Sequence, residues 1–379
     1  MTTVVVSPYN VASFLEGGGH FWVYMQYVLG LRQLGCQVYW LEQFNRGPET
    51  KRGKAILQIF SERMQSFGMQ DNFILYFTDK NSNQIAFVGR EAEEVKSIFR
   101  QTDLLINFHY AAENRILKYF RRTALVDIDP GLLQFWMTHQ QLSVQPHDLY
   151  FTIGETVGTD WALFPDCGLS WIQIRPVVHL ASWPLTYVHE AKSFTSVSTW
   201  ETEDWLVADH EAYYENSKRI NWRRFARLPQ NTNQELELAL YLTDHYDSER
   251  KWMESLGWQI RLSTEVAGTP DKYRSFIQHS RGEFSVVKPS CIFFQNAWMS
   301  DRSLCYLASG KPVVMQNTGP STYLPDDQGL FRFSTMEQAA IAIEEINRSY
   351  LHHCKAAREI AETYFDSQKV LQELLHRAL

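Results

Sequence analysis

The 379-residue sequence lacks several features that mark large classes of proteins. It has no uninterrupted apolar run of about 18 residues, so we expect no transmembrane helix. The opening MTTVVVSPYN lacks the basic and apolar regions of a signal peptide and is typical of a β-strand. Its five cysteines include no CxxC pair, which disfavours a zinc site or a disulfide framework and fits reduced thiols. These absences predict a cytoplasmic protein.

An excess of positive charge is absent as well. The chain carries 36 Lys and Arg residues against 43 Asp and Glu residues, a net charge of −7. Proteins that bind nucleic acid or anionic membranes through general electrostatic attraction are basic. The composition therefore predicts no nucleic-acid partner, although it does not exclude a local basic groove, and it gives no indication of the oligomeric state.

Two common nucleotide-binding motifs are incomplete. The segment GGGHFW does not complete G-x-G-x-x-G, because Trp22 occupies the position of the last glycine. The segment GKP, which begins at Gly310, lacks the Ser or Thr that follows the lysine of a P-loop. A nicotinamide-dependent oxidoreductase and an ATPase therefore have little support.

Strand-like and helix-like segments alternate twice along the chain. In the first half the strand-like segments are TTVVVSPY, CQVYWLE, DLLINFH, TALVDID and DLYFTIG. In the second half FTSVSTW, GWQIRL and EFSVVK are strand-like, whereas NQELELALYL and TPDKYRSFIQHS are typical of helices. This alternation predicts an α/β fold of two doubly wound domains that face each other across a cleft. We place the domains at 1–187 and 188–379, joined by a linker near 183–194, and the last helix could pack back on the first domain.

The segment WMSDRSLCYLASGKPVVMQNTG, residues 298–319, combines a polar helix start with a short apolar helix and a strand. Ser300 or Asp301 is a suitable N-cap, and Gly310 suits the position after the helix end. The free N–H groups of a helix start attract anions, and Arg302 would strengthen that attraction. Alternatively, Asp301 only caps the helix and Arg302 only pairs with it, so both interpretations stay open.

The order of segments in the second half resembles that of the GT-B glycosyltransferases. SDRSLCYLASGKPVVMQNTG is similar to their donor-binding segment, with GEFSVVK before it and LPDDQGLFRFSTMEQAAIAI and AAREIAETYFDSQKVLQELL after it. EGGGHFWVYMQYVLGLRQLGCQVYWLE is similar to the glycine-rich opening of the acceptor side. The resemblance implies two Rossmann-like domains, with the acceptor on residues 1–187 and a nucleotide-sugar such as a UDP-sugar on residues 188–379.

The resemblance also implies a set of donor-binding residues. The diphosphate would lie at the helix start, near a basic residue that stabilises the leaving group, and the loop after the next strand would face the sugar. The donor-binding residues implied in this way are Lys288, Ser300, Asp301, Arg302, Ser303, Gln316, Thr318 and Gly319. The simpler alternatives are a solvated lysine for Lys288 and ordinary turn chemistry for the NTG segment.

The chain departs from the family at the residue that binds ribose in many members. Cys305 stands where those relatives have Glu, and Ala297 stands at the first position of their E-x7-E spacing. Asp301 is a candidate to replace that Glu as the ribose contact. The sequence does not determine whether the anomeric configuration is retained or inverted.

Candidate catalytic residues lie in the first half. His20 follows Gly18 and Gly19 at a helix start, and an imidazole with a pKa near neutrality suits a general base. Asp127 and Asp129 close a strand, where they could orient the acceptor, replace His20 as base, or simply cap the strand end. The D-x-D pattern does not match the metal-dependent glycosyltransferase fold, so we favour neither a divalent metal nor another cofactor.

Three residues complete the predicted acceptor side, and one basic segment is set aside. Gly18, Gly19 and Glu155 are predicted to contact the acceptor, although His20 and its glycines could instead only pack at the helix end. The basic run KRINWRRFARLP, from Lys218 to Pro229, is interpreted as a solvated helix face, with binding of an acidic ligand as the less favoured alternative.

The sequence therefore predicts a hexosyltransferase-like glycosyltransferase that moves a sugar from a nucleotide-sugar to an acceptor hydroxyl. Two alternatives stay open. One is a sugar-nucleotide epimerase or hydrolase on the same scaffold. The other is a protein that binds a nucleotide-sugar without turnover, and the presence of Cys305 in place of Glu supports this alternative.

Overall fold

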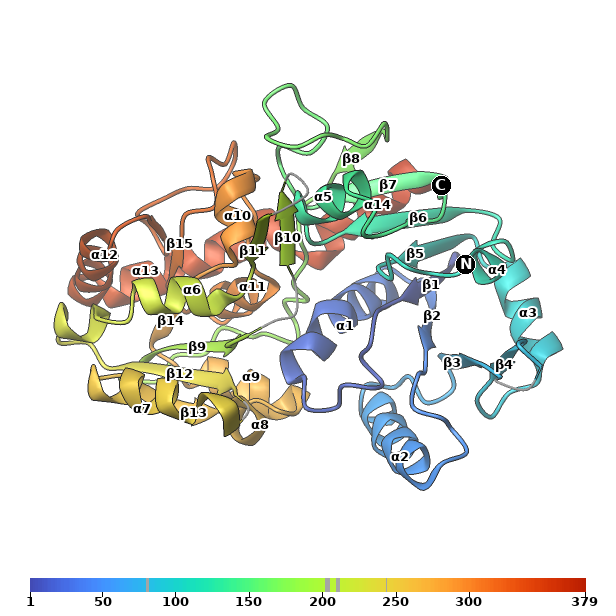
Figure 1. Cartoon of the computed structure of the whole chain (residues 1–379), viewed down its shortest axis with the longest axis horizontal. Coiled ribbons are helices and arrows are strands. Elements are labelled where there is room, and N and C mark those ends of the chain that lie inside the picture. Colours follow the sequence, from blue (N-terminus) through green and yellow to red (C-terminus); the bar gives the residue numbers. More distant parts are fainter. Residues whose placement is uncertain (80–81, 202–204, 209–211, 243) are drawn as a thin grey trace.

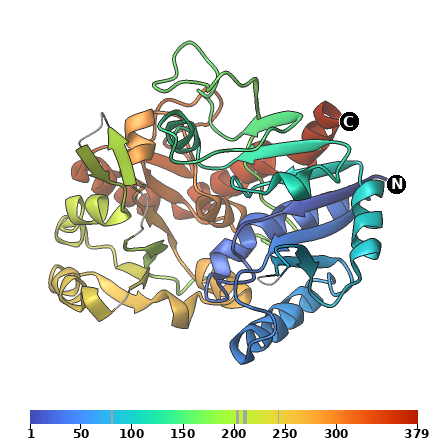
Figure 2. The same ribbon diagram turned by 45° about the vertical axis from the view of Figure 1, so that its right-hand side comes forward.

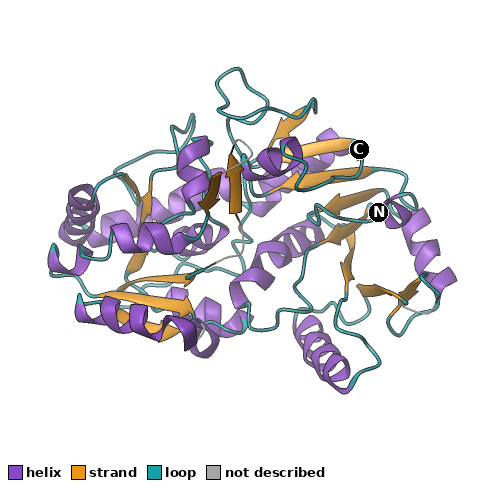
Figure 3. Cartoon of the chain, in the orientation of Figure 1, coloured by secondary structure: helices purple, strands orange, loops and turns teal. Residues whose placement is uncertain are grey.

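The computed structural model describes residues 1–79, 82–201, 205–208, 212–242 and 244–379. Two α/β lobes lie beside each other, the first coloured blue to green and the second yellow to red (Figure 1). The lobes are also separate in the turned view (Figure 2), and helices surround the strands of both (Figure 3). The predicted α/β class with two doubly wound domains is confirmed.

The first lobe is built on an eight-stranded sheet of order β4-β3-β2-β1-β5-β6-β7-β8. Its strands are β1 (Thr3–Ser7), β2 (Gln37–Gln43), β3 (Phe73–Thr78), β4 (Ile85–Phe87), β5 (Leu104–Asn107), β6 (Thr123–Asp127), β7 (Leu149–Thr152) and β8 (Trp171–Gln173). Among the described pairs of this sheet, only the pairing of β3 with β4 is antiparallel. Strands β5 and β6 are buried along their whole length, as expected for a parallel sheet that is covered on both faces.

The second lobe has a parallel six-stranded sheet of order β13-β12-β9-β14-β15-β16. Its strands are β9 (Phe194–Thr199), β12 (Leu236–Tyr241), β13 (Gln259–Leu262), β14 (Gly282–Ser285), β15 (Val313–Gln316) and β16 (Leu330–Phe333). A separate antiparallel hairpin joins β10 (Trp205–Ala208) to β11 (Ala212–Glu215). In both sheets the chain builds outward from the first strand, returns, and builds in the other direction, which is the doubly wound arrangement.

Helices fill the connections between these strands. Those of the first lobe are α1 (Gly18–Gln33), α2 (Lys51–Ser66), α3 (Ala92–Gln101), α4 (Asn114–Leu117) and α5 (Leu132–Thr138). Those that follow are α6 (Lys218–Arg224), α7 (Asp247–Ser255), α8 (Ser263–Val266), α9 (Pro270–Gln278), α10 (Pro289–Phe294), α11 (Asp301–Ala308), α12 (Met336–Arg348), α13 (Tyr350–Ile360) and α14 (Ser367–Ala378). Short 3₁₀ turns span Leu228–Gln230 and Asp244–Tyr246, and a π-helical turn spans Ala361–Phe365.

One predicted element is wrong. The segment NQELELALYL was expected to be a helix, but it contains strand β12, paired in parallel with β9 and β13. Glu, Leu and Ala favour helices locally. The three leucines Leu236, Leu238 and Leu240, however, follow the period of two of a strand, and all three are buried in the second lobe's core. Burial between two neighbouring strands outweighs the local preference.

The carboxyl-terminal helix α14 returns to the first lobe and packs against α1. This packing is close, because a Cβ atom on Gly30 of α1 would lie 2.6 Å from Leu371 Cδ1 and 2.7 Å from Ser367 Cβ. The first sheet ends with β8 at Gln173, and the second begins with β9 at Phe194. Within the described chain, no helix combines the length and apolarity needed to cross a membrane.

Candidate functional site

A cavity of about 430 Å³ lies between the two lobes. Its first-lobe wall comes from the start of α1 and from residues that follow β1, β6 and β7. Its second-lobe wall comes from the ends of β9 and β12, the segment after β14 and the start of α11. The carboxyl ends of both sheets therefore face this cavity, the position at which doubly wound folds bind ligands. We call it the cleft cavity.

Two lysines stand at one end of the cleft cavity. Lys218 and Lys288 line both the cleft cavity and an adjoining side cavity of about 130 Å³. Asp129, Ser300 and Asp301 are shared by the same two cavities. The junction of the cavities thus combines two amines, two carboxylates and a hydroxyl, a set that can bind both phosphate oxygens and sugar hydroxyls.

Lys218 was not predicted as a site residue, and the favoured interpretation of its segment as a solvated helix face does not hold for this residue, whose position fits the alternative of acidic-ligand binding. It is the first residue of α6 and lies at the junction of the cavities. Burial, followed by repulsion from Arg302 and Lys288, lowers the pKa of the Lys218 amine to about 7. A cation at a helix start is opposed by the helix dipole, and that local conflict is the signal that could have identified it from the sequence.

The start of α11 lies at the cleft cavity, as the position of the segment suggested. Ser300 caps this helix, its Oγ accepting a hydrogen bond from the Arg302 amide at 3.3 Å. Asp301 lines the cleft and side cavities, and burial raises the pKa of its carboxyl group. Ser303 points elsewhere: it is fully buried, it is not among the residues that line either cavity, and its Oγ has no partner in the described chain.

Arg302 reaches the cavity wall, but its guanidinium group is held by other residues. Its Nε donates to Glu283 Oε1 at 2.6 Å, and its Nη1 donates to the Val197 carbonyl at 2.9 Å. Arg302 is 6% exposed and Glu283 is fully buried. The structure therefore gives Arg302 a partner other than Asp301, and this buried pair ties α11 to β14 and β9.

Cys305 makes a contact between the lobes rather than a contact with the cleft cavity. The Gln26 side chain of α1 donates to Cys305 Sγ at 3.7 Å, and Cys305 is buried. Gln26 also accepts from the His179 amide at 2.9 Å. The position at which the resemblance implied a ribose-binding Glu therefore holds a side chain that packs against α1.

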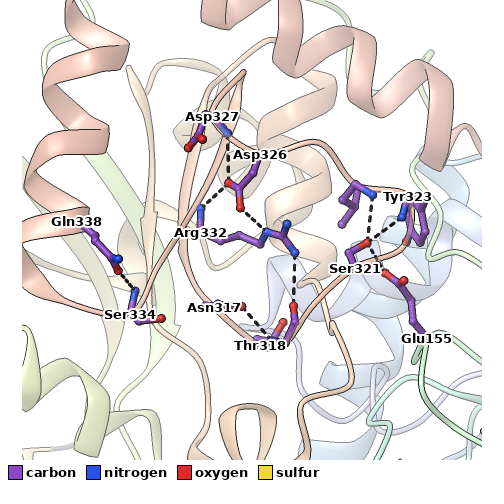
Figure 4. Close-up of polar contacts among 12 residues, drawn as sticks. Glu155, Asn317, Thr318, Ser321, Tyr323, Asp326, Asp327, Arg332, Ser334 and Gln338 are labelled. Carbon is purple, nitrogen blue, oxygen red and sulfur yellow. Dashed lines mark hydrogen bonds and ion pairs between the residues drawn. The ribbon is translucent and has the colours of Figure 1, made fainter. Parts of the chain in front are cut away.

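The loop after β15, predicted to face the sugar, is held by polar contacts with its neighbours, some of which Figure 4 shows. Gln316 is buried and bonded to Asn221 and to the Val287 amide, while Thr318 Oγ1 donates to the Trp298 carbonyl at 2.7 Å. Gly319 lies so close to Gln295 that a Cβ atom would come within 2.7 Å of its backbone. None of the three predicted residues is among those that line this cavity in the described chain.

Glu155 joins the two lobes. Its carboxylate accepts from Ser321 Oγ at 2.5 Å, from the Thr322 amide at 2.7 Å and from Thr322 Oγ1 at 2.9 Å. Figure 4 shows Glu155 reaching Ser321 at the end of the loop after β15. With three donors already bound, its carboxylate fits an interlobe clamp better than the predicted acceptor contact.

His20 lines the cleft cavity on the first-lobe side. Its Nε2 lies 2.7 Å from the Tyr9 carbonyl, and because a carbonyl can only accept, Nε2 carries a proton. The basic lone pair of the neutral ring is then at Nδ1. Burial lowers the pKa of His20 below its usual value, so the ring is neutral at physiological pH.

Asp127 and Asp129 have different surroundings although they are two residues apart. Asp127 is fully buried, accepts from Gln134 at 2.9 Å and from Thr152 at 3.0 Å, and has a pKa raised to about 7, chiefly by burial. Asp129 lies beyond the end of β6 and lines the cleft and side cavities. Tyr110 connects them, because its hydroxyl is 3.4 Å from an oxygen of each carboxylate.

Gly18 and Gly19 line the cleft cavity, and their lack of a side chain has a structural reason. A Cβ on Gly18 would lie 2.3 Å from the Ala267 carbonyl oxygen, and one on Gly19 would lie 2.7 Å from the Tyr273 ring. The start of α1 is therefore pressed against the second lobe. The two glycines permit this close approach, so packing between the lobes explains them without a contact to an acceptor substrate.

Metal-ligating residues do not gather anywhere in the part of the chain that the structure describes: no three His, Cys, Asp or Glu side chains are placed to share an ion. The expectation that the protein uses neither a divalent metal nor another cofactor stays a prediction.

Known proteins resemble this chain in structure but not in sequence. No protein-family model and no curated protein sequence matches it. An α-glucosyltransferase in complex with UDP and a 13-mer DNA has a TM-score of 0.62 at 12% identity, covering 100% of this chain and 99% of that one. HepE from Anabaena in complex with UDP and glucose has a TM-score of 0.58 at 8% identity, covering 100% and 99%.

A third similar structure is sucrose-phosphate synthase from Thermosynechococcus elongatus, with a TM-score of 0.53 at 10% identity and coverage of 100% and 98%. These likenesses span both lobes. The chain therefore has the GT-B glycosyltransferase fold, and the predicted resemblance is confirmed at the level of the fold.

The prediction that excluded nucleic-acid partners is wrong. The α-glucosyltransferase, which shares this fold across the whole chain, is bound to DNA. A net charge of −7 averages over the whole surface, whereas binding depends on the local field at the site. Net charge therefore gives no ground for excluding nucleic acid from the partners of this fold.

Proposed function

We propose that the protein is a glycosyltransferase that moves a sugar, hexose-like in size, from a UDP-sugar to an acceptor hydroxyl. One observation carries this proposal. The cleft cavity lies at the carboxyl ends of both sheets, with two lysines on its second-lobe wall and a carboxylate from the first lobe at the same junction. The UDP complexes of the similar structures support the choice of donor.

In this proposal the donor diphosphate lies between Lys218 and Lys288, beside the capped start of α11. Negative charge grows on the leaving diphosphate as the bond to the sugar breaks, and nearby amines stabilise it. Asp301, at the same junction, has carboxylate oxygens that can accept hydrogen bonds from the hydroxyls of ribose or of the donor sugar. Arg302 supports the site through Glu283 and Val197 rather than by direct contact.

Asp129 is the favoured proton acceptor in this proposal. The acceptor O–H gives its proton to Asp129 as the new bond to the anomeric carbon forms, and the UDP leaves with the electrons of the broken bond. His20 competes for the role, with its basic nitrogen at Nδ1. Asp129 is preferred because it lies at the junction with the lysines, whereas His20 lines only the larger of those two cavities.

The test begins with calorimetric titration of the whole protein with UDP, and the absence of binding would overturn the proposal. UDP release from UDP-glucose and related donors is then followed with and without acceptors. Release that rises with acceptor concentration supports transfer. Release that is unaffected by acceptors indicates a hydrolase, and binding without release indicates a non-catalytic protein.

A further inference from the structure

A tyrosine hydroxyl lies between the two aspartates at the end of β6. The Tyr110 hydroxyl is 3.4 Å from Asp127 Oδ1 and 3.4 Å from Asp129 Oδ2. A phenol has one proton, so this hydroxyl can donate to only one of the two carboxylates at a time. Both distances are longer than is usual for O–H···O hydrogen bonds. Neither carboxylate therefore holds the hydroxyl tightly, and a small movement can bring it to either one.

Backbone amides fix the position of the Tyr110 oxygen. It accepts from the Ile128 amide at 2.9 Å and from the Asp129 amide at 3.2 Å. The Asp129 amide also donates to Asp127 Oδ1 at 3.0 Å, so its hydrogen is shared between the two oxygens. Burial, followed by the charges of Asp129 and Asp127, raises the pKa of the Tyr110 hydroxyl well above its usual value. The hydroxyl therefore keeps a proton, and it can pass one on only as it receives another.

Asp127 is suited to hold a proton for a time. It is fully buried, and its Oδ2 is already bonded to Gln134 and Thr152, so Oδ1 is the oxygen that faces Tyr110. Burial raises the pKa of Asp127 to about 7, whereas an ordinary aspartate has a pKa of about 3.9. A proton that reaches Asp127 is thus retained near neutral pH, where an ordinary carboxylate would release it.

Few other charges act on this group. The side chains that bond Asp127 from α5 and β7, Gln134 and Thr152, are both uncharged, and the charge that acts on it is that of Asp129. The other titratable side chains near Tyr110 or Asp129 are Tyr24 of α1 and, at the junction of the cavities, Lys218, Lys288, Cys291 and Asp301.

We propose that Tyr110 relays the acceptor's proton from Asp129 to Asp127. The relay rests on the proposed function, in which Asp129 takes that proton from the acceptor hydroxyl. Asp129 then gives the proton to the Tyr110 oxygen while the Tyr110 proton moves to Asp127 Oδ1, which leaves Asp129 ionised and Asp127 protonated. After the products leave, the reverse transfer returns the proton to Asp129 and from there to water. Tyr110 and Asp127 are positioning residues, because both act through Asp129.

The first test is the pH dependence of kcat for UDP release from UDP-glucose, with the acceptor that increases this release most. The donor is saturating, so that the titration of Lys218 does not contribute. Only ionised Asp127 can receive the proton, so kcat should rise about tenfold as the pH increases through 7. Tyr110→Phe and Asp127→Asn should each have a low kcat without this rise. A residue that only supported the fold would lower kcat equally at every pH.

Tyr119→Phe is the matched control. It removes a hydroxyl from a partly buried tyrosine of the same lobe, and Tyr119 lines none of the cavities found in the described chain. This variant should keep the native kcat and the native rise through pH 7. If Tyr110→Phe does not fold, Asp127→Asn alone is compared with the control.

Infrared titration of the protonated carboxyl band tests the same aspartate without any substrate. The whole protein should show a carboxyl group that titrates at about pH 7 and is lost in Asp127→Asn. Tyr110→Phe should raise this midpoint by up to about one pH unit, because the ionised carboxylate loses a hydrogen-bond donor. Tyr119→Phe should leave the midpoint unchanged.

Two results would overturn the relay: a rise of kcat through pH 7 that persists in Tyr110→Phe, or an infrared midpoint that this variant does not move. Failure of UDP binding or of transfer would instead remove the proposed function. The infrared titration then still decides whether Tyr110 is coupled to Asp127, because it requires neither donor nor acceptor.

Discussion

The two halves of the cleft are built on sheets that are both doubly wound, and they present different chemistry. Each sheet builds outward from its first strand in two directions, and each places a cavity wall at the switch point. In the second lobe the wall carries the amines of Lys218 and Lys288. In the first lobe it carries aromatic rings and the carboxylate of Asp129.

This difference comes from the connections between strands and not from the strands. Lys218 follows the hairpin inserted after β9, and Lys288 follows β14. The rings of Phe108 and Tyr110 follow β5, and Tyr9 follows β1. The strand order determines where a ligand lies, whereas the loops determine which ligand it is. Mutations on the two sides should therefore affect different measurable quantities.

The largest expected effect is on turnover and comes from the first-lobe side. Asp129→Asn should lower kcat by about 10²–10⁴, because the acceptor proton loses its base, and should leave UDP affinity unchanged. His20→Ala should lower kcat by less than about tenfold if His20 only lines the cavity. The two are compared by initial rates of UDP release, and the reverse order would transfer the base to His20.

Removal of Arg302 should affect stability before it affects binding. Arg302→Ala leaves the Glu283 carboxyl group buried without its charge partner, which should lower the free energy of unfolding by about 3–5 kcal/mol. Urea denaturation measures this loss. The double variant Arg302→Met with Glu283→Leu removes both charges and should recover most of it. If the Arg302→Ala protein has normal stability but binds UDP weakly, Arg302 contacts the donor directly.

Lys218 should affect binding alone. Lys218→Met should weaken UDP about 10- to 100-fold, the range expected when a charge-assisted contact is lost, with little change in the melting temperature. Arg227→Met is the control, because Arg227 is an exposed cation a few residues further along the same segment. If calorimetry shows that both substitutions weaken UDP binding equally, Lys218 contributes only general positive charge and makes no specific contact with UDP.

The smallest expected effect is a pH dependence of UDP affinity. The pKa of Lys218 is about 7 in the free protein, and only the protonated amine attracts the diphosphate. Affinity should therefore be highest below pH 7 and should fall as the pH rises above it, by at most about tenfold per pH unit. Titrations at pH 6.5, 7.5 and 8.5 measure this slope. It should disappear above pH 7 in Lys218→Met, and a slope unchanged in that variant would assign it to another group.

The sequence predicted the architecture well because regular burial leaves a regular pattern. Strands β1, β5 and β6 each contain an uninterrupted apolar run, as buried parallel strands require, and the polar start of α11 predicted a capped helix. Strand β12 was mistaken for a helix, since Glu, Leu and Ala have helical preferences that only the flanking strands override.

Site residues were predicted less well, because a pattern along the chain does not show what a side chain meets across the fold. Glu155 is a clamp to Ser321 and Thr322, which are more than 160 residues away. Asp127 and Asp129 look alike in the sequence, yet one is bonded inside the core and the other borders the cavities. Lys218 seemed one of several basic residues in its segment until the fold brought it to Lys288.

By itself the sequence determined the class of fold, the two domains' alternating order and the helix start at Ser300, since hydrophobic periodicity and capping act over a few neighbouring residues. Only the tertiary structure decided which polar groups face the cleft. That choice depends on contacts between loops of different strands: the lysines meet at the side cavity, the rings gather beside Asp129, and Arg302 is withdrawn to Glu283. Burial and charge pairing across the fold set those positions, and neither is encoded in local spacing.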